Sequence, residues 1–160
     1  MLITEKYKPK ISSNIIGQYY NIKHLKLWIN KWNIKNNKCV ILHGPPSTGK
    51  TLCANIIPKE NGYYIVEYNG SDIRTKNNLE KEITETQNIQ NIQSFFIKKK
   101  KLIIMEDLDS LNEKGSITEI INILKKTTCP IILICNEITK ELKTLSSYCL
   151  NLKFYKPKIE

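Results

Sequence analysis

The octapeptide at residues 44–51, Gly-Pro-Pro-Ser-Thr-Gly-Lys-Thr, constrains this chain more than any other stretch. It fits the pattern G-x-x-x-x-G-K-[ST], in which glycines let the backbone wrap so that N–H groups point at a phosphate. An apolar run at residues 39–42 precedes it, and a run able to continue as a helix until Pro58 follows it. Strand, loop and helix therefore come in the order that a phosphate-binding loop requires, which a chance turn between two elements explains less well.

Each position of this loop has an expected role in binding a triphosphate. Lys50 is expected to reach the outer phosphates, and the Thr51 hydroxyl is expected to bind Mg²⁺. The N-terminus of the following helix completes the site, because its first backbone N–H groups have no partner inside the helix. The predicted phosphate-binding residues are Gly44, Pro45, Pro46, Ser47, Thr48, Gly49, Lys50 and Thr51.

Two further apolar runs end in polar side chains. Residues 102–105 lead directly into Glu106 and Asp107. A buried strand that stops in carboxylates is the expected second half of a phosphate-loop ATPase, where one carboxylate holds the Mg²⁺ shell and the other orients or deprotonates water. An acidic turn after a core strand would explain this stretch alone, but the upstream loop favours the ATPase interpretation. Asn136 follows the run 131–135, at the strand end where open α/β sheets bind ligands; its spacing fits an ordinary strand-ending Asn equally well.

Composition limits the class of protein. A chain of 160 residues with 41% hydrophobic content is long enough for one globular core. Its net charge of +10 favours DNA or RNA as a partner, although the lysine run at residues 98–101 fits a solvated loop as well as a DNA contact. Five cysteines without C-x-x-C spacing indicate buried thiols in a reducing compartment. No stretch approaches the ~20 apolar residues that cross a bilayer, so a soluble, intracellular protein without a membrane partner is expected.

Hydrophobic periodicity places the other elements. Strands are predicted at residues 39–42, 63–66, 102–105, 131–135 and 149–154. Helices are predicted at residues 19–32, more weakly at 75–92, after Gly115 with Ser116 as N-cap, and near 139–145. Helices that alternate with wholly apolar strands predict a parallel sheet covered on both faces.

Several motifs, in order, resemble the AAA+ module of eukaryotic clamp loaders, specifically the large subunit of replication factor C. They are Lys-Tyr-Lys-Pro at residues 6–9, Ile-Ile-Gly-Gln at 15–18, the phosphate loop, and residues 69–74, 103–109, 134–136 and 149–154. The resemblance covers essentially the whole chain. It implies an α/β P-loop NTPase fold, a three-layer sandwich whose five-stranded parallel sheet has the order 5-1-4-3-2, with residues 1–160 forming one nucleotide-binding domain.

The resemblance also implies a function and site residues. The function is an ATP-driven, nuclear machine that opens a sliding clamp and places it on primer–template DNA, with ATP and Mg²⁺ as cofactors. Its partners would be clamp-loader small subunits, one of which donates an arginine finger. By the resemblance, Ile15, Ile16, Gly17 and Gln18 border the adenine; Thr51 and Glu106 hold the metal; and Lys50, Asp107 and Asn136 are catalytic, Asn136 as the sensor of the terminal phosphate and attacking water.

Three departures from the family pattern bear on turnover. Tyr148 stands where the small subunits carry the finger arginine, as is also the case in large subunits. The chain stops just after Pro157, where the family continues into a helical lid and a collar. Glu106 and Asp107 reverse the usual Asp-Glu order. A degenerate nucleotide- and DNA-binding scaffold without turnover therefore stays open, whereas a small-molecule kinase is disfavoured because no substrate-binding insertion is evident.

Overall fold

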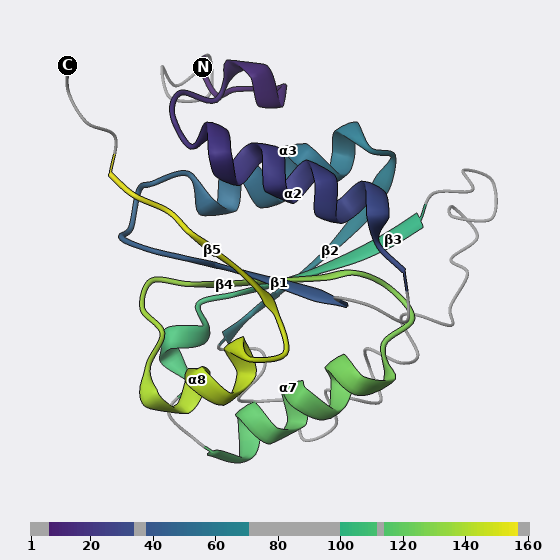
Figure 1. The fold of residues 1–160 in the computed structure, drawn as a ribbon, viewed down its shortest axis with the longest axis vertical. Coiled ribbons are helices and arrows are strands. Elements are labelled where there is room, and N and C mark those ends of the chain that lie inside the picture. Colours follow the sequence, from purple (N-terminus) through teal and green to yellow (C-terminus); the bar gives the residue numbers. More distant parts are fainter. Residues whose placement is uncertain (1–6, 34–37, 71–99, 112–113, 157–160) are drawn as a thin grey trace.

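The computed structural model describes residues 7–33, 38–70, 100–111 and 114–156 (Figure 1). The helices are α2 (Tyr19–Lys31), α3 (Lys50–Glu60), α7 (Lys114–Lys126) and α8 (Lys140–Ser146), with short 3-10 turns η1 (Ser12–Asn14) and η2 (Leu108–Ser110). The strands are β1 (Cys39–His43), β2 (Tyr63–Asn69), β3 (Lys100–Glu106), β4 (Ile131–Cys135) and β5 (Leu150–Lys153).

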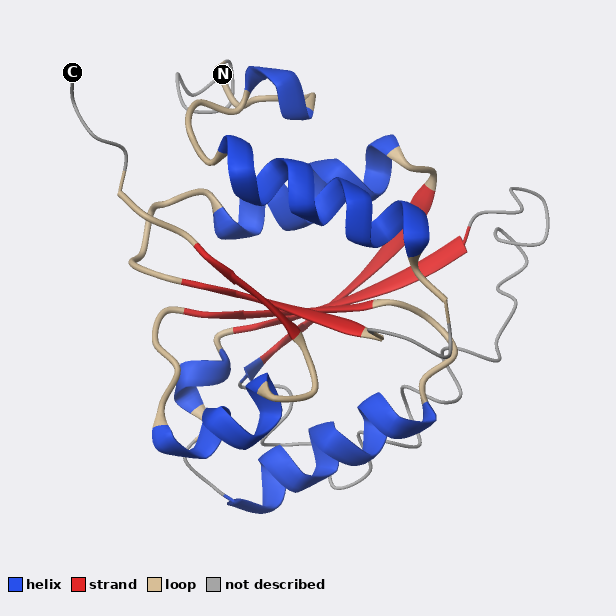
Figure 2. Ribbon diagram, in the orientation of Figure 1, coloured by secondary structure: helices blue, strands red, loops and turns tan. Residues whose placement is uncertain are grey.

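The five strands form one sheet in the order β2-β3-β4-β1-β5, and every neighbouring pair is parallel (Figure 2). This confirms the predicted order, read from the opposite edge. His43, the last residue of β1, lies opposite Cys135 of β4 and Lys153 of β5. The carboxyl ends of these three strands are therefore level, and the segments that follow them meet at one edge of the sheet.

Alternate side chains of the central strands enter two separate cores. Val40 and Leu42 of β1 pack on the face covered by α2 and α3. Cys39 and Ile41 pack on the opposite face, which α7 and α8 cover. A strand that is buried on both faces needs apolar side chains at every position, so the apolar runs of β1 and β4 are continuous. This continuity is what predicted the parallel sheet correctly.

Helix α3 continues past the proline that was expected to end it. The helix runs to Glu60, and Pro58 lies inside its last turn with its ring buried. The missing N–H of Pro58 removes one hydrogen bond, but the N–H of Asn61 closes the turn by donating to the carbonyls of Ile57 and Pro58 at 3.3 and 3.0 Å. Burial of the ring compensates for the lost bond, so the predicted end of this helix was wrong.

The start of α7 also differs from expectation. The helix begins at Lys114, so Gly115 and Ser116 lie in its first turn and Ser116 is not the N-cap. A glycine is tolerated there because the first-turn N–H groups have no partner within the helix in any case. The last strand is shorter than predicted, covering Leu150–Lys153.

Two expectations fall partly or wholly outside the described residues. The helix predicted at residues 75–92 lies outside them, as do Lys98 and Lys99 of the lysine run. Lys100 and Lys101 belong to β3 rather than to a loop, and burial lowers the pKa of the Lys101 ammonium.

The cysteines and the helices also bear on the expected environment. Four of the five cysteines are buried, as predicted, and burial raises the pKa of Cys53 and of Cys135 to about 12. Among the described helices, none combines the length and the apolar character needed to cross a bilayer.

Candidate nucleotide-binding site

The loop at residues 44–49 has the backbone shape of a phosphate cradle. Gly44, Ser47 and Gly49 have φ values of 140°, 62° and 91°, in a region that L side chains rarely adopt. Gly44 is required for a second reason, because a Cβ there would lie 2.2 Å from the carbonyl oxygen of Phe154. The loop leads directly into α3, whose first helical residue is Lys50.

Lys50 is buried, and its ammonium is directed at the loop and at β4. The Nζ atom donates to the carbonyls of Gly44 at 2.6 Å and Pro45 at 2.8 Å, and to Asn136 Oδ1 at 3.0 Å. Burial lowers the pKa of Lys50, while the negative charge of Asp109 acts in the opposite direction. The structure thus brings together two residues, Lys50 and Asn136, that are 86 positions apart in the sequence.

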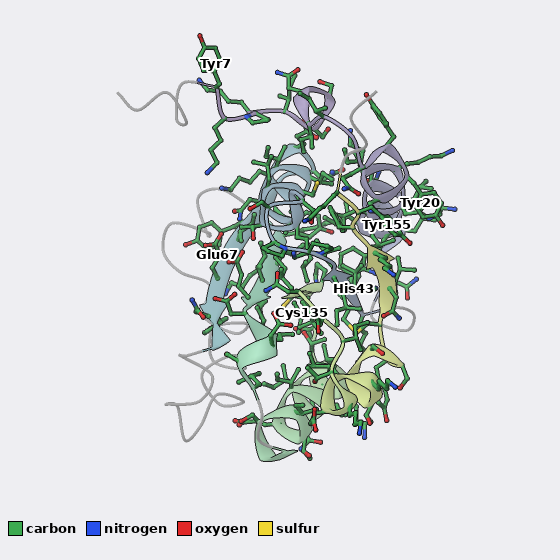
Figure 3. The ribbon with its side chains drawn as sticks, turned by 90° about the vertical axis from the view of Figure 1, so that its left-hand side faces the viewer. Tyr7, Tyr20, His43, Glu67, Cys135 and Tyr155 are labelled. Carbon is green, nitrogen blue, oxygen red and sulfur yellow. The ribbon has the colours of Figure 1, made fainter. Side chains whose placement is uncertain are left out.

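Asn136 lies directly after β4, and its backbone is held on both sides. Its carbonyl accepts from the N–H of Gly44 at 3.0 Å, which ties it to the first residue of the phosphate loop. Its N–H donates to the carboxylate of Asp109. His43 and Cys135, the residues that precede Gly44 and Asn136, lie side by side at paired positions of β1 and β4 (Figure 3). The Asn136 side chain itself remains exposed, so a ligand can reach it.

Glu106 and Thr51 meet beside the loop. The Thr51 hydroxyl lies beside the Glu106 carboxylate and lowers its pKa, and the carboxylate's Oε1 atom is buried and has no hydrogen-bond partner among the described residues. Burial raises the pKa of Glu106, the neighbouring Thr51 hydroxyl lowers it, and the charges of Glu67 and Asp107 raise it further. A buried carboxylate oxygen without a donor, next to a hydroxyl, fits a hard cation such as Mg²⁺, which takes its other ligands from phosphates and water.

Asp107 occupies a different environment from Glu106. It is exposed and has a φ of 54°, an uncommon conformation for a residue other than glycine. Its carbonyl accepts from the N–H and the hydroxyl of Ser110 at 3.0 and 2.8 Å. Gly70, at the end of β2, packs so closely that a Cβ there would lie 2.5 Å from the same carbonyl. The backbone of Asp107 is therefore fixed, in a left-handed conformation that the sequence did not predict.

The segment expected to border the adenine is connected to the phosphate loop through residues 153–155. Gln18 Nε2 donates to the carbonyl of Tyr155, and Asn21 Nδ2 donates to Gln18 Oε1 at 2.9 Å and to the carbonyl of Lys153 at 2.8 Å. Between these two, the N–H of Phe154 donates to the carbonyl of His43 at 2.7 Å. In this segment, Ile15 is buried and Ile16 is 87% exposed.

Sequence reasoning missed two acidic residues. Asp109 received no role, although its carboxylate accepts from the backbone N–H groups of both Asn136 and Glu137. Glu60 accepts from the N–H and hydroxyl of Ser12 at 2.8 and 2.6 Å, which anchors the N-terminal segment to the end of α3. A carboxylate shortly after β3 was a usable signal for Asp109, because the neighbouring strand ends at the same edge with N–H groups that need acceptors.

Comparisons with known proteins agree with this geometry. Residues 40–156 match the ATPase family associated with various cellular activities (AAA). The chain is 30% identical to replication factor C subunit 1 of Homo sapiens over 100% of its length, and 28% identical to that of Drosophila melanogaster over 100%. It is 32% identical to the replication factor C large subunit of Methanosarcina mazei over 94% of its length. It spans only 17%, 20% and 25% of these relatives, respectively.

Solved structures support the fold alone. The chain is similar to C. elegans PCH-2 with a TM-score of 0.69 and 15% identity, covering 96% of this chain and 47% of that one. It is similar to a chain from a study of katanin self-assembly with a TM-score of 0.65 and 21% identity, covering 90% of this chain and 52% of that one. With its parallel sheet, phosphate loop and matching sequence over residues 40–156, the chain belongs to the AAA family of ATPases.

Proposed function

We propose that the chain is the ATP-binding module of a clamp-loader large subunit, which helps to place a sliding clamp on primer–template DNA. The observation that carries the proposal is the convergence of two contacts beside one loop. Lys50 Nζ lies 3.0 Å from Asn136 Oδ1, and the Thr51 hydroxyl lies beside the Glu106 carboxylate. A buried cation, an exposed amide and a hydroxyl–carboxylate pair are the groups that a triphosphate with its metal would need.

The proposed roles follow from the chemistry of each group. Lys50 and the N–H groups at the start of α3 would bind the phosphates. Thr51 and Glu106 would hold Mg²⁺, whose positive charge would neutralise the negative charge of the phosphates. Asn136 contacts the terminal phosphate and the attacking water. Asp107 orients that water or accepts its proton. The segment at residues 15–18 borders the adenine.

The proposed partners rest on similarity and charge. Relatives named replication factor C subunit 1 or replication factor C large subunit match nearly the whole chain, which supports small subunits, a sliding clamp and a nuclear site of action. The net charge of +10 supports DNA as a ligand. Tyr148, which is 48% exposed, gives the chain no arginine to supply to a neighbour. The chain's own site would receive its arginine finger from a small subunit.

A second candidate function is a nucleotide-binding scaffold without turnover. Its supporting observation is the acidic pair, in which Glu106 takes the position beside Thr51 and Asp107 is placed in an exposed, left-handed turn. The two candidates share nucleotide binding and differ in hydrolysis. Single-turnover assays with candidate small subunits and primed DNA separate them, because the scaffold should bind ATP and leave it intact.

Nucleotide binding is tested with Lys50→Ala. The variant should bind ATP at least about tenfold more weakly, since a charge-assisted bond is worth ~1.5–3 kcal/mol. Titration calorimetry of ATP and ADP measures the loss, and Lys59→Ala, which removes an exposed lysine from the same helix, is the matched control. Unchanged ATP affinity in Lys50→Ala would refute the phosphate site, and equal losses in both variants would reduce it to a general charge effect.

DNA binding is tested by its salt dependence. Duplex DNA should bind weakly and without sequence preference, through basic side chains and the N–H groups at the first turn of α7. The affinity should fall steeply between about 50 and 200 mM salt, because phosphate contacts release counterions. A salt-insensitive affinity, or a preference for one sequence, would contradict this part of the proposal.

A further inference from the structure

The turn after β3 carries a carboxylate that reaches across to the end of β4. Asp109 lies in η2, three positions after Glu106. Its Oδ1 atom accepts from the N–H of Asn136 at 2.9 Å and from the N–H of Glu137 at 3.0 Å, and its Oδ2 atom accepts from the N–H of Asn136 at 2.7 Å. Both oxygens are therefore engaged with the backbone that carries the Asn136 side chain.

These bonds complete the fixation of Asn136. Asp109 holds its N–H, Gly44 donates to its carbonyl at 3.0 Å, and Lys50 donates to its side-chain oxygen at 3.0 Å. Without the carboxylate, the N–H groups of Asn136 and Glu137 would face water at an exposed strand end. Since bonds from N–H groups to an ionised acceptor are stronger than neutral ones, Asp109 contributes a stronger backbone restraint than Gly44 does.

The backbone that Asp109 holds also carries the side chain that meets the phosphate loop. Asn136 Oδ1 accepts from Lys50 Nζ at 3.0 Å, and Lys50 also donates to the carbonyls of Gly44 and Pro45. One carboxylate therefore positions the amide that contacts Lys50. Asp109 itself does not need to touch a nucleotide to do this.

We propose that Asp109 is a positioning residue that holds Asn136 in the orientation needed to distinguish ATP from ADP. This inference rests on the proposed function. It adds that Asp109 determines how strongly the site prefers ATP, which has a terminal phosphate, over ADP. Removal of the carboxylate frees the Asn136 backbone, so the amide loses its fixed distance to Lys50. Binding of the inner phosphates, which depends on loop N–H groups, should remain.

The test compares Asp109→Ala with Asp109→Asn. The ratio of ATP to ADP affinity should fall about three- to tenfold in Asp109→Ala, the size of one ordinary hydrogen bond, while ADP affinity stays near that of the unmodified chain. Asp109→Asn keeps one carbonyl oxygen that can accept from both N–H groups, and it should retain most of the ratio. Glu141→Ala, which removes an exposed carboxylate from α8, is the control for charge loss.

A second measurement detects the geometry without nucleotide. The amide protons of Asn136 and Glu137 should exchange slowly with solvent despite their exposure, and the protection should disappear in Asp109→Ala while that of Ile134 within β4 persists. An unchanged ATP-to-ADP ratio in Asp109→Ala, or equal losses of ATP and ADP affinity, would overturn the inference. Unchanged ATP affinity in Lys50→Ala would instead overturn the proposed function, so the two failures are distinguishable.

Discussion

The phosphate loop after β1 and the acidic turn after β3 lie at the same edge of the sheet but are determined in different ways. The phosphate-binding function of the loop depends on its backbone. Its left-handed residues and the start of α3 present N–H groups to a ligand, and most of the loop side chains do not affect this. The acidic turn depends on side chains, because Glu106 is half-buried beside Thr51 while Asp107 is exposed. The order of two carboxylates therefore changes which one reaches the metal position.

This difference separates binding from chemistry. A Mg²⁺ site tolerates a longer side chain, since water fills the remaining ligand positions. General-base catalysis needs hydrogen-bond reach of ~2.6–3.2 Å, so a carboxylate one methylene too short is misplaced. The comparison predicts strong nucleotide binding and slow hydrolysis in the same molecule.

The largest expected effect is on the acidic turn. Restoring the usual order with Glu106→Asp and Asp107→Glu together should raise the rate of single-turnover hydrolysis by up to about a hundredfold, because a misplacement of ~1 Å costs that much. ATP affinity should change little. The assay contains a finger-donating small subunit, and the two single variants are the controls. If the double variant hydrolyses ATP at the original rate, the reversed order is neutral and the comparison between the regions fails.

The next effect concerns the loop. Gly44→Ala should destabilise the fold by more than the ~1–3 kcal/mol that left-handed strain costs, because the new Cβ would also meet Phe154. Gly62→Ala is the matched control, since Gly62 has a φ of 77° and a Cβ there would have nothing within 4 Å. Chemical denaturation measures both variants. Equal losses of unfolding free energy would show that contact with Phe154 does not shape the loop.

A smaller effect is the pH dependence contributed by Glu106. Its folded-state pKa is raised, so its contribution to stability is fully present below about pH 4, the ordinary carboxyl range, and is lost as pH rises through the folded pKa. Glu106→Gln should therefore be the more stable form at neutral pH and lose the advantage in acid. Thermal unfolding from about pH 4 to pH 7.5 follows this difference. Mg²⁺ with ATP should narrow the difference in stability between the two proteins at neutral pH. A difference in stability that grows in acid would contradict the raised pKa of Glu106.

The smallest effect is expected at Ser47, the one loop residue other than glycine with a left-handed φ, 62°. Ser47→Gly relieves strain of ~1–2 kcal/mol but adds conformational freedom to the unfolded chain, so stability should rise by less than about 1 kcal/mol. ATP affinity should stay the same or rise slightly. Denaturation and calorimetry together measure this, and a loss of stability would mean that the serine side chain supports the loop.

The sequence predicted the elements whose signal is local. Continuous apolar runs located β1 and β4, and the octapeptide located the loop and the start of α3. The sequence could not predict that α3 continues past Pro58. The hydrogen bond that Pro58 cannot make is offset by burial of its ring and by the bonds that the N–H of Asn61 donates. The left-handed turn at Asp107 packs closely against Gly70, a contact that the pairing of β2 with β3 brings about and that the local sequence does not indicate. Asp109 was missed for the same reason, since its partners lie 27 and 28 positions away, directly after the neighbouring strand β4.

Residues 153–155 connect the two ends of the candidate site through their backbone. Gln18 and Asn21 bind the carbonyls on either side of Phe154, and Phe154 itself is bonded to His43 and lies against Gly44. The segment next to the adenine position and the first residue of the phosphate loop therefore cannot move apart without breaking bonds to the same three residues. A movement that keeps these bonds carries the end of β5 with it, so a force applied to the chain at Tyr155 would act on the adenine and phosphate ends at once.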